Sequence, residues 1–356
     1  MKFTGLDLET APCQDQPQPY ALQPWRAREG TARVTSCAVA KATGQSKAVL
    51  GYYSDLKALM DSLRGQVVVT WNGVFDVSWL IASAQDVSGI TWVDAMHLWK
   101  WAENSQHKEH RPAWSLVDGA RHWLKDWLGL QAFLDMKAEE HAAGENDEYW
   151  EARGRLDALV TVMIAERVWA ELTSQQQTSA MIEGACIVPV ARSWVSGIYA
   201  DSAQAAAMAE PMAQEMRQLE QKLGTEPTVL RSPKQLGALL YDEWGLPCSR
   251  FTDAGARSSD KAALTYLADI DDRMLDLLRW RELNTQYTKF IEGIRKCKEY
   301  LGTDITHPSP KLFSTYTGRF TYASRSGRKG EAYKAKIGLP IHQWPRNKQL
   351  RGLIKV

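Results

Sequence analysis

The sequence has few of the features that mark secreted, disulfide-bonded or membrane proteins. Its five cysteines are scattered and form no C-x-x-C pair, so neither a disulfide framework nor a cysteine zinc site is predicted. No apolar run approaches the ~18 residues of a membrane span, and the N-terminus lacks a basic start followed by an apolar stretch. No G-x-x-x-x-G-K-[ST] motif occurs, so ATP hydrolysis is not indicated. We therefore expect a soluble cytoplasmic protein with no membrane partner.

Net charge is also small, at +1, but positive charge is concentrated at one end of the chain. From Lys311 onward there are eleven Lys and Arg residues against one acid, Glu331. Such a concentration favours a polyanionic partner, and nucleic acid is the first candidate. A solvated or disordered tail is the alternative, although six aromatic residues in the same segment argue against simple disorder.

The apolar pattern divides the chain into a mixed first part and a helical second part. At 356 residues, the length suggests about two domains. Residues 1–100 alternate strands, such as 34–40 and 47–53, with helices, which is an α/β pattern. The Pro- and Gln-rich segment 14–30 is predicted to be a surface loop. Residues 181–301 are predicted to be nearly all helical, with short β-like pieces after them.

Two acids, Asp7 and Glu9, interrupt the first apolar strand. Residues two apart on a strand point to the same face, so these two carboxylates lie side by side. Burying like charges together is unfavourable and raises their pKa values, and the usual remedy is a bound cation. An exposed strand end with solvated acids is the alternative, and the D-x-E pattern alone does not decide between the two.

Two further acids occur in segments whose other residues are mainly apolar and are predicted to be buried in the core. Asp76 lies one turn into a helix that follows a buried strand, and Asp157 lies in a mainly apolar helix. Carboxylates are hard oxygen ligands that suit Mg²⁺ or Mn²⁺, and two such ions ~3.5–4 Å apart promote hydrolysis at phosphorus. Four such acids in one α/β unit therefore predict a metal cluster. Asp94, in contrast, is expected to end a strand or cap a helix.

The motifs that contain these acids, LDLET, NGVFD and LDALVT, resemble those of the DEDD 3′→5′ exonucleases, whose fold is similar to ribonuclease H. Downstream segments resemble, in the same order, the thumb and early palm of family A DNA polymerases. These segments are IVPVARSWVSGIYAD, SPKQLGALLYDEWGLP, LLRWRELNTQYTKFIEGI, STYTGRFTYASRSG and GLPIHQWPRNKQLRGLI. The resemblance runs from about residue 3 to the last residue, so the chain looks like the N-terminal portion of a phage-like family A DNA polymerase.

This resemblance implies three regions along the chain. Residues 1–175 correspond to a ribonuclease H-like exonuclease domain of class α/β, with a mixed sheet flanked by helices. Residues 176–302 correspond to a mainly helical, DNA-binding thumb, and residues 303–356 to an incomplete start of the palm. In the family, the polymerase metal ligands come later in the sequence. We therefore expect no polymerisation by this chain alone, and a second polypeptide carrying palm and fingers as its partner.

The resemblance also implies roles for individual residues. The acids Asp7, Glu9, Asp76 and Asp157 are expected to be the catalytic residues and to bind two Mg²⁺ or Mn²⁺ ions. The residues expected to contact a single-stranded 3′ end or a primer–template duplex are Thr10, Asn72, Phe75, Arg153, Thr317, Arg319, Gln343, Arg346 and Arg351. A helix cap for Asn72 and a core position for Phe75 are the alternatives.

One position departs from the family pattern. The family usually places a Tyr four residues before the last acid, and relatives place a His five before, to orient the attacking water. Here these positions are Arg153 and Ala152. Arg153 shares a helix face with Asp157, so it either pairs with that carboxylate or stabilises charge on the phosphate. Tyr149 is able to replace the missing group only if the chain is not a continuous helix there.

Two functions are compatible with these features. The first is a DNA replication enzyme whose 3′→5′ exonuclease removes a mismatched nucleotide by two-metal hydrolysis. The second is a catalytically weak or inactive DNA-binding or assembly subunit of a split DNA polymerase. A stand-alone ribonuclease of the same fold is a third possibility, and the thumb-like segments argue against it.

Overall fold

The structure is a computed structural model whose described residues fall into two compact units. Unit 1 comprises residues 1–197 and 307–335, and unit 2 comprises residues 198–306 and 336–356. The described residues are 1–13, 23–43, 47–103, 114–139, 146–315, 318–323 and 337–355. None of the helices in these ranges is both long and apolar enough to cross a bilayer. The three functional regions expected from the sequence, with limits at 175 and 302, stay a prediction.

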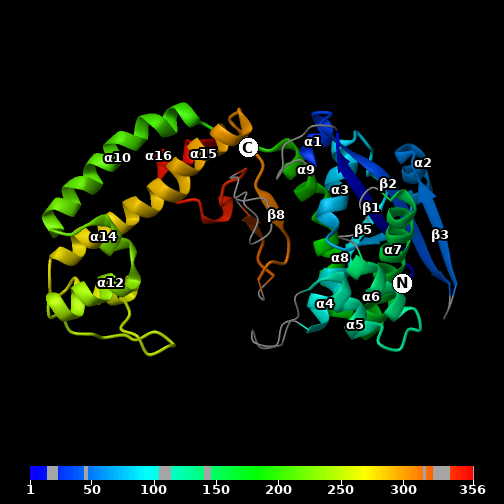
Figure 1. Cartoon of the computed structure of the whole chain (residues 1–356), viewed down its shortest axis with the longest axis horizontal. Coiled ribbons are helices and arrows are strands. Elements are labelled where there is room, and N and C mark those ends of the chain that lie inside the picture. The colour runs from blue at the N-terminus through cyan, green and yellow to red at the C-terminus, as the bar shows by residue number, and fades with distance from the viewer. Residues whose placement is uncertain are drawn as a thin grey trace. The chain divides into compact units, whose positions relative to one another are not determined.

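Unit 1 is built on a five-stranded mixed sheet with the order β3-β2-β1-β4-β5 (Figure 1). The strands are β1 (Thr4–Pro12), β2 (Ala32–Thr43), β3 (Lys47–Tyr53), β4 (Val67–Thr70) and β5 (Thr91–Asp94). The first three strands pair antiparallel, whereas β4 runs parallel to both β1 and β5. The prediction of an α/β region with a mixed sheet is therefore confirmed.

Helices cover this sheet, and the longest of them is α7. The helices are α1 (Trp25–Arg28), α2 (Leu56–Leu63), α3 (Gly73–Ala82), α4 (Ala95–Glu103), α5 (Leu116–Trp123), α6 (Leu130–Glu139), α7 (Asp147–Glu171), α8 (Ser174–Ala185) and α9 (Ile187–Ser196). A separate hairpin consists of β8 (Ser309–Lys311) and β9 (Thr321–Ala323). The side chain of Asn146 caps α7 by accepting a hydrogen bond from the Tyr149 amide. From this start, α7 runs along β1, β2, β3 and β4 (Figure 1).

The segment predicted to be a surface loop contains a short helix. Its described part includes α1, and Trp25 in α1 is buried. The Trp25 ring stacks on His307, with 4.1 Å between ring centroids and 7° between planes. The ring nitrogen Nδ1 of His307 lies 2.9 Å from the carbonyl oxygen of Trp194. A tertiary aromatic contact therefore outweighs the polar composition of this segment.

Unit 2 is mainly helical, as the sequence predicts for this part of the chain. Its helices are α10 (Ser202–Leu223), α11 (Pro227–Arg231), α12 (Pro233–Ala238), α13 (Lys261–Leu267), α14 (Arg273–Gln286), α15 (Glu292–Leu301) and α16 (Lys348–Arg351). Two single-turn π-helices, η3 (Leu239–Glu243) and η4 (Tyr287–Ile291), continue α12 and α14, and η5 (Ile341–Gln343) is a 3₁₀ turn. A small sheet has the order β10 (Ile354–Lys355), β6 (Ile198–Ala200), β7 (Ile305–Thr306).

The core of unit 2 forms along one face of α10. Met212, Met216, Leu219 and Leu223 recur at helical spacing and are buried together with side chains of α14 and α15. Asp201 caps the start of α10 by accepting from the Gln204 amide, at 2.8 Å. The apolar stripe of α10 is therefore a packing surface.

Candidate functional site

The first strand lies in direct contact with α7. Gly5 is on β1, and a Cβ atom there would overlap the carbonyl oxygen of Ala158, so only glycine permits this approach. One turn earlier on α7, a Cβ on Gly154 would lie 3.6 Å from Asp7 Oδ2 and 3.7 Å from Glu9 Oε1. Residues 5, 7 and 9 share one face of the strand, so both acids of β1 face α7.

Asp157 lies on α7 beside this contact and is bound by two cations. Its side chain is 4% exposed, and its Oδ2 lies 2.5 Å from Lys137 Nζ on α6. The Arg153 Nε, one helical turn away, lies 3.6 Å from the same oxygen. Arg153 Nη1 also donates to both carboxylate oxygens of Glu9, at 3.2 and 3.3 Å. Arg153 thus bridges the acids of β1 and α7.

Asp76 reaches the same strand from α3. It lies in the first turn of that helix, is 5% exposed, and accepts hydrogen bonds from its own amide and that of Leu8. Leu8 is the residue between Asp7 and Glu9, so the carboxylate of Asp76 lies next to both acids of β1. The structure therefore brings Asp7, Glu9, Asp76 and Asp157 near one another.

The start of α3 is held by Asp94 at the end of β5. Asp94 Oδ2 accepts from the Gly73 amide at 2.8 Å, and Oδ1 accepts from the Met96 amide at 2.9 Å. These bonds satisfy amides at the first turns of both α3 and α4. The expectation that Asp94 caps a helix is confirmed, and the cap fixes the point from which Asp76 projects.

The ionisation of Asp7 and Asp76 is affected by burial and by the charges of neighbouring acids. Burial raises the pKa of Asp7 well above its usual value, and the charges of Asp157, Glu9 and Asp76 raise it further, while Lys137 lowers it. Burial likewise raises the pKa of Asp76, with further contributions from Asp94 and Glu9. Water is excluded and like charges accumulate, so a bound cation would stabilise the ionised cluster.

The chemistry of the four donors fits Mg²⁺ or Mn²⁺, since these ions prefer carboxylate oxygens. The four carboxylates also outnumber the two cations that contact them, Lys137 and Arg153. Over the described ranges, however, no three His, Cys, Asp or Glu side chains are grouped as a metal site. The assignment of the four acids as metal ligands therefore stays a prediction.

Arg153, which stands where the family usually has Tyr, forms a salt bridge. Arg153 pairs most closely with Glu9 and lies next to Asp157, so the ion-pair alternative is the one that the structure contains. Helix α7 is continuous from Asp147, which places Tyr149 ~12 Å along the axis from Asp157. The Tyr149 hydroxyl donates to the carbonyl oxygen of Met136 at 2.6 Å. Because the helix is not interrupted, Tyr149 does not take the place of the tyrosine that usually orients the attacking water.

Three residues expected to meet a DNA 3′ end lie around this cluster. Asn72 occupies the N-cap position of α3 in the left-handed region (φ 67°), but its exposed side chain makes no capping hydrogen bond. Phe75 is half-buried and packs edge-on against Trp79, with ring centroids 6.0 Å apart. Thr10 follows a bulge that shifts the pairing of β1 with β2 after Glu9. Their contact with DNA stays a prediction.

Sequence reasoning missed Lys137. This residue begins an acidic stretch, KAEEHAAGENDEYWE, in which one lysine is not distinctive. In the structure, the stretch begins inside α6, and Lys137 is only 14% exposed while it contacts Asp157. A buried contact between residues twenty positions apart leaves no local pattern in the sequence.

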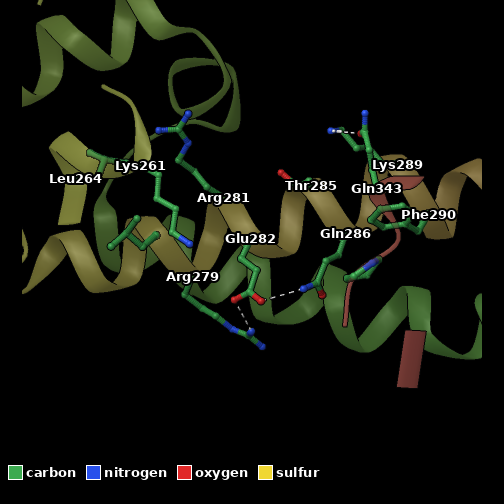
Figure 2. A pocket seen from close by; sticks show the side chains of 12 residues that line it. Lys261, Leu264, Arg279, Arg281, Glu282, Thr285, Gln286, Lys289, Phe290 and Gln343 are labelled. Atoms are coloured by element: carbon green, nitrogen blue, oxygen red, sulfur yellow. Dashed lines mark hydrogen bonds and ion pairs between the residues drawn. The ribbon is translucent and has the colours of Figure 1, made fainter. Parts of the chain in front are cut away.

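Unit 2 contains an open pocket of about 720 Å³ between α13, α14 and the segment around η5 (Figure 2). Four basic residues line it together with one acid, Glu282. The basic residues are Lys261, Arg279, Arg281 and Lys289. Gln343, one of the predicted DNA contacts, lines the same pocket and accepts from Lys289 Nζ at 3.2 Å (Figure 2).

The other predicted DNA contacts are distributed over both units. Arg346 and Arg351 belong to unit 2 and are exposed. Arg319 belongs to unit 1, is exposed, and donates from its amide to Thr315 Oγ1 at 2.9 Å. Thr317 lies outside the described residues.

Comparisons with known proteins show what this chain is similar to. Residues 202–325 match the family described as DNA polymerase family A. The chain is related to the family A DNA polymerases. It is 30% identical over 109 residues to the DNA polymerase of Bacillus phage SP01, covering 31% of this chain and 11% of that protein. It is 25% identical over 288 residues to DNA polymerase I of Geobacillus stearothermophilus, covering 76% of this chain and 29% of that protein.

A solved polymerase has a similar fold. It is described as the POL domain of Pol1 from M. smegmatis in complex with DNA primer-template and dNTP. The TM-score is 0.64 at 18% identity, covering 98% of this chain and 54% of that chain, which shows a common fold and no more. The chain spans less than a third of the length of the curated polymerases cited above. The predicted relation to family A polymerases is confirmed, and the exonuclease assignment stays a prediction.

Proposed function

We propose that this chain is a 3′→5′ DNA exonuclease that acts in proofreading within a family A DNA polymerase. The observation that carries the proposal is the proximity of four acids from β1, α3 and α7 in one buried place. Buried carboxylates raise each other's pKa values and are unfavourable unless a cation compensates them. The strand order β3-β2-β1-β4-β5, with two antiparallel and two parallel pairings, supports a ribonuclease H-like fold for unit 1.

In this proposal, Asp7, Glu9, Asp76 and Asp157 would hold two Mg²⁺ or Mn²⁺ ions. Such ions, when bound, generate a nucleophilic water at neutral pH and stabilise the charge of the phosphodiester that is cleaved. The protein contributes fixed positions for its own groups. Asp94 fixes the first turn of α3, from which Asp76 projects inward, and the exposed Asn72 side chain is available to the terminal nucleotide.

Around the acids, Thr10 and Phe75 complete the proposed binding place for a single-stranded 3′ end. The half-buried Phe75 ring, held against Trp79, offers an apolar edge for a base. Arg153 keeps Glu9 in place through two hydrogen bonds to its carboxylate. These contacts involve phosphate, sugar and ring faces, so little sequence selectivity is expected.

For unit 2 we propose binding of a primer–template duplex. The basic side chains around the pocket on α14 are suited to phosphates, and Gln343 in the pocket and the exposed Arg346 and Arg351 of the same unit are proposed to take part. In unit 1, the exposed Arg319 is proposed to take part. Binding of this kind depends strongly on salt, because each phosphate contact releases counterions.

A nuclease assay tests the proposal. The full chain is incubated with 5′-labelled single-stranded DNA and Mg²⁺ or Mn²⁺, and a ladder shortening from the 3′ end is expected. An Asp7→Ala, Glu9→Ala double variant should give no ladder. Asp86→Ala removes an exposed acid of the same unit and should leave the ladder unchanged. Absence of a ladder from the unaltered protein, with DNA binding retained, would contradict the exonuclease proposal.

That negative result would support the second candidate, a catalytically weak or inactive DNA-binding or assembly subunit of a split polymerase. The observation that favours it is the pairing of Asp157 and Glu9 with cations of the protein itself. Addition of a second polypeptide with palm and fingers, together with dNTPs, tests the assembly role by primer extension. A 5′-labelled RNA in parallel tests the ribonuclease alternative.

A further inference from the structure

We propose that Lys137 is an internal counter-ion which occupies the carboxylate site of unit 1 and must leave it when divalent ions bind. The inference rests on the proposed function, because it takes the four acids as the metal site. It adds a regulatory property, since the protein's own ammonium group would compete with the metal and set the ion concentration at which the site fills.

The contacts of Asp157 carry this inference. Lys137 Nζ lies 2.5 Å from Asp157 Oδ2, which is a short charge-assisted contact. The Nε of Arg153 lies 3.6 Å from the same oxygen. Mg²⁺ binds carboxylate oxygens at about 2.0–2.1 Å, so an ion held by Asp157 would lie within a few ångströms of this ammonium group. Repulsion between a divalent ion and an ammonium at that range, in a site that excludes water, disfavours their joint presence.

The two cations differ in how they are held. The Arg153 guanidinium lies over the Trp150 ring, 4.9 Å from its centroid, and donates twice to Glu9. Lys137 is on a different helix, α6, and has a flexible four-carbon stem. The Tyr149 hydroxyl binds the carbonyl of the preceding residue, Met136, and so holds the backbone at the base of this stem. Lys137 is therefore the cation that is able to swing away while the helices keep their places.

The carboxylate oxygens are engaged by cations of the protein itself. In the cation-paired state, Asp157 directs an oxygen to Lys137, and Glu9 directs both of its oxygens to Arg153. Departure of Lys137 leaves Asp157 beside Asp7, whose ionisation it already affects. The carboxylates are thus neutralised either by Lys137 together with Arg153 or, after Lys137 has left, by divalent ions.

Mn²⁺ binding tests the inference. Affinity is measured by titration calorimetry for the full chain, for Lys137→Met and for Lys125→Met, an exposed lysine of the same unit. We expect Lys137→Met to bind Mn²⁺ about tenfold more tightly than the unaltered protein, within the 5–150-fold range usual for coupled sites. Lys125→Met should bind like the unaltered protein, and an Asp7→Ala, Glu9→Ala double variant should not bind at this site.

Thermal unfolding gives a second readout that does not depend on activity. Without metal, Lys137→Met should melt at a lower temperature, because buried carboxylates lose a counter-ion, and Mn²⁺ should raise its melting temperature more than that of the unaltered protein. Lys137→Gln should behave in the same way. A variant that stays unfolded at saturating Mn²⁺ would contradict the inference, because the ion should replace the missing cation.

The outcomes separate this inference from the proposed function. Equal Mn²⁺ affinities of Lys137→Met and the unaltered protein, both abolished by the double variant, would overturn the counter-ion role and leave the exonuclease proposal standing. If neither protein binds Mn²⁺ at the four acids, both proposals fall.

Discussion

The two units of this chain use charge in opposite ways. Unit 1 gathers four carboxylates in a place where Asp76 and Asp157 are almost completely buried, and it balances them with partly buried cations. Unit 2 arranges basic side chains around an open pocket, where Arg279 pairs with exposed acids. Burial amplifies each interaction in the first case, and solvent weakens it in the second. This difference is the reason for proposing bond-breaking chemistry in unit 1 and polyanion binding in unit 2.

This contrast also separates the energetic roles of the ion pairs. Exposed pairs such as Arg279–Glu215, with side chains 46% and 42% exposed, typically contribute ~0–1 kcal/mol. Buried pairs such as Lys137–Asp157 are worth little in total, but removal of one partner typically costs ~3–5 kcal/mol. Substitutions at the buried ion pairs of unit 1 are therefore expected to change both stability and activity, whereas those at the pocket of unit 2 mainly change binding.

The largest expected effect follows neutralisation of one buried acid, Asp76→Asn. We expect DNA cleavage to fall by about 10²–10³-fold or more, which is the range for loss of one charge-stabilising group. Without metal, the variant should nevertheless melt about 2–6 °C higher than the unaltered protein. The substitution removes a buried carboxylate that is repelled by the charges of Asp94 and Glu9. A nuclease assay and calorimetry measure the two effects. Asp242→Asn, at an exposed pair with Arg257 in unit 2, is the control and should change neither. Unchanged cleavage would break the assignment of chemistry to unit 1.

A similarly large effect is expected from Gly5→Ala, which tests the contact of β1 with α7. The added methyl group would meet the Ala158 carbonyl, so strand and helix must separate, at a cost of about 3 kcal/mol in the free energy of unfolding. Gly154→Ala on the same interface meets its neighbours only at 3.6–3.7 Å and should leave stability nearly unchanged. Urea unfolding of the two variants compares them directly. Equal stabilities would show that the close approach at Gly5 does not hold α7 in place.

A smaller effect concerns the pH dependence of unit 1. Burial raises the pKa of Glu183 from its usual 4.5 to about 7, against the hydrogen bond that Trp101 donates to it. The folded state therefore holds a proton that the unfolded state releases above pH ~4.5, and stability falls as pH rises from there to about 7. Glu183→Gln should remove this decline, so its stability relative to the unaltered protein should rise by roughly 1–3 kcal/mol across that interval.

Unfolding in urea at several pH values measures this difference. His97 Nδ1 lies 3.6 Å from Glu183 Oε1, and burial lowers the pKa of the His97 imidazole from its usual 6.5. The stability that His97 contributes is therefore lost as the pH falls below 6.5. This change has the opposite sign and remains in the variant. Glu292→Gln removes a partly buried carboxylate whose pKa is lowered by its hydrogen bond with Arg295, so it titrates below this interval and the variant should leave the profile between pH 4.5 and 7 almost unchanged. Identical profiles for Glu183→Gln and the unaltered protein would contradict the prediction.

The smallest effect is expected at the pocket of unit 2. Lys289→Met should weaken binding of a primer–template duplex by about three- to tenfold, uniformly across sequences, and reduce the salt slope of log K by about 1. Stability should change by less than ~0.5 kcal/mol. Fluorescence anisotropy at several salt concentrations measures both affinity and slope, and Lys222→Met on α10, outside the pocket, is the matched control. If the loss of affinity in Lys289→Met depended on the DNA sequence, Lys289 would contact bases rather than phosphates.

Local patterns predicted much of the fold. The strand expected at residues 47–53 is β3, and the stripe of Met212, Met216, Leu219 and Leu223 has the helical spacing of a packing surface. The polar composition of the stretch TSQQQTSA favours a loop, yet the stretch contains the start of α8, where Thr173 and Gln176 form a capping box. Trp25 was placed in a surface loop although its ring is buried against His307. Both departures depend on contacts that composition does not reveal.

The sequence by itself determined which residues are the candidates for chemistry. Asp7, Glu9, Asp76 and Asp157 stand out because acids in apolar strands and helices are costly, and this cost is visible in the local pattern. Only the tertiary structure decided how these acids are neutralised. Their proximity depends on Gly5, which admits the Ala158 carbonyl, and their balance depends on Lys137, which comes from another helix. Such contacts join residues far apart in the chain, and electrostatic energy depends on distance and burial, which periodicity along the sequence does not encode.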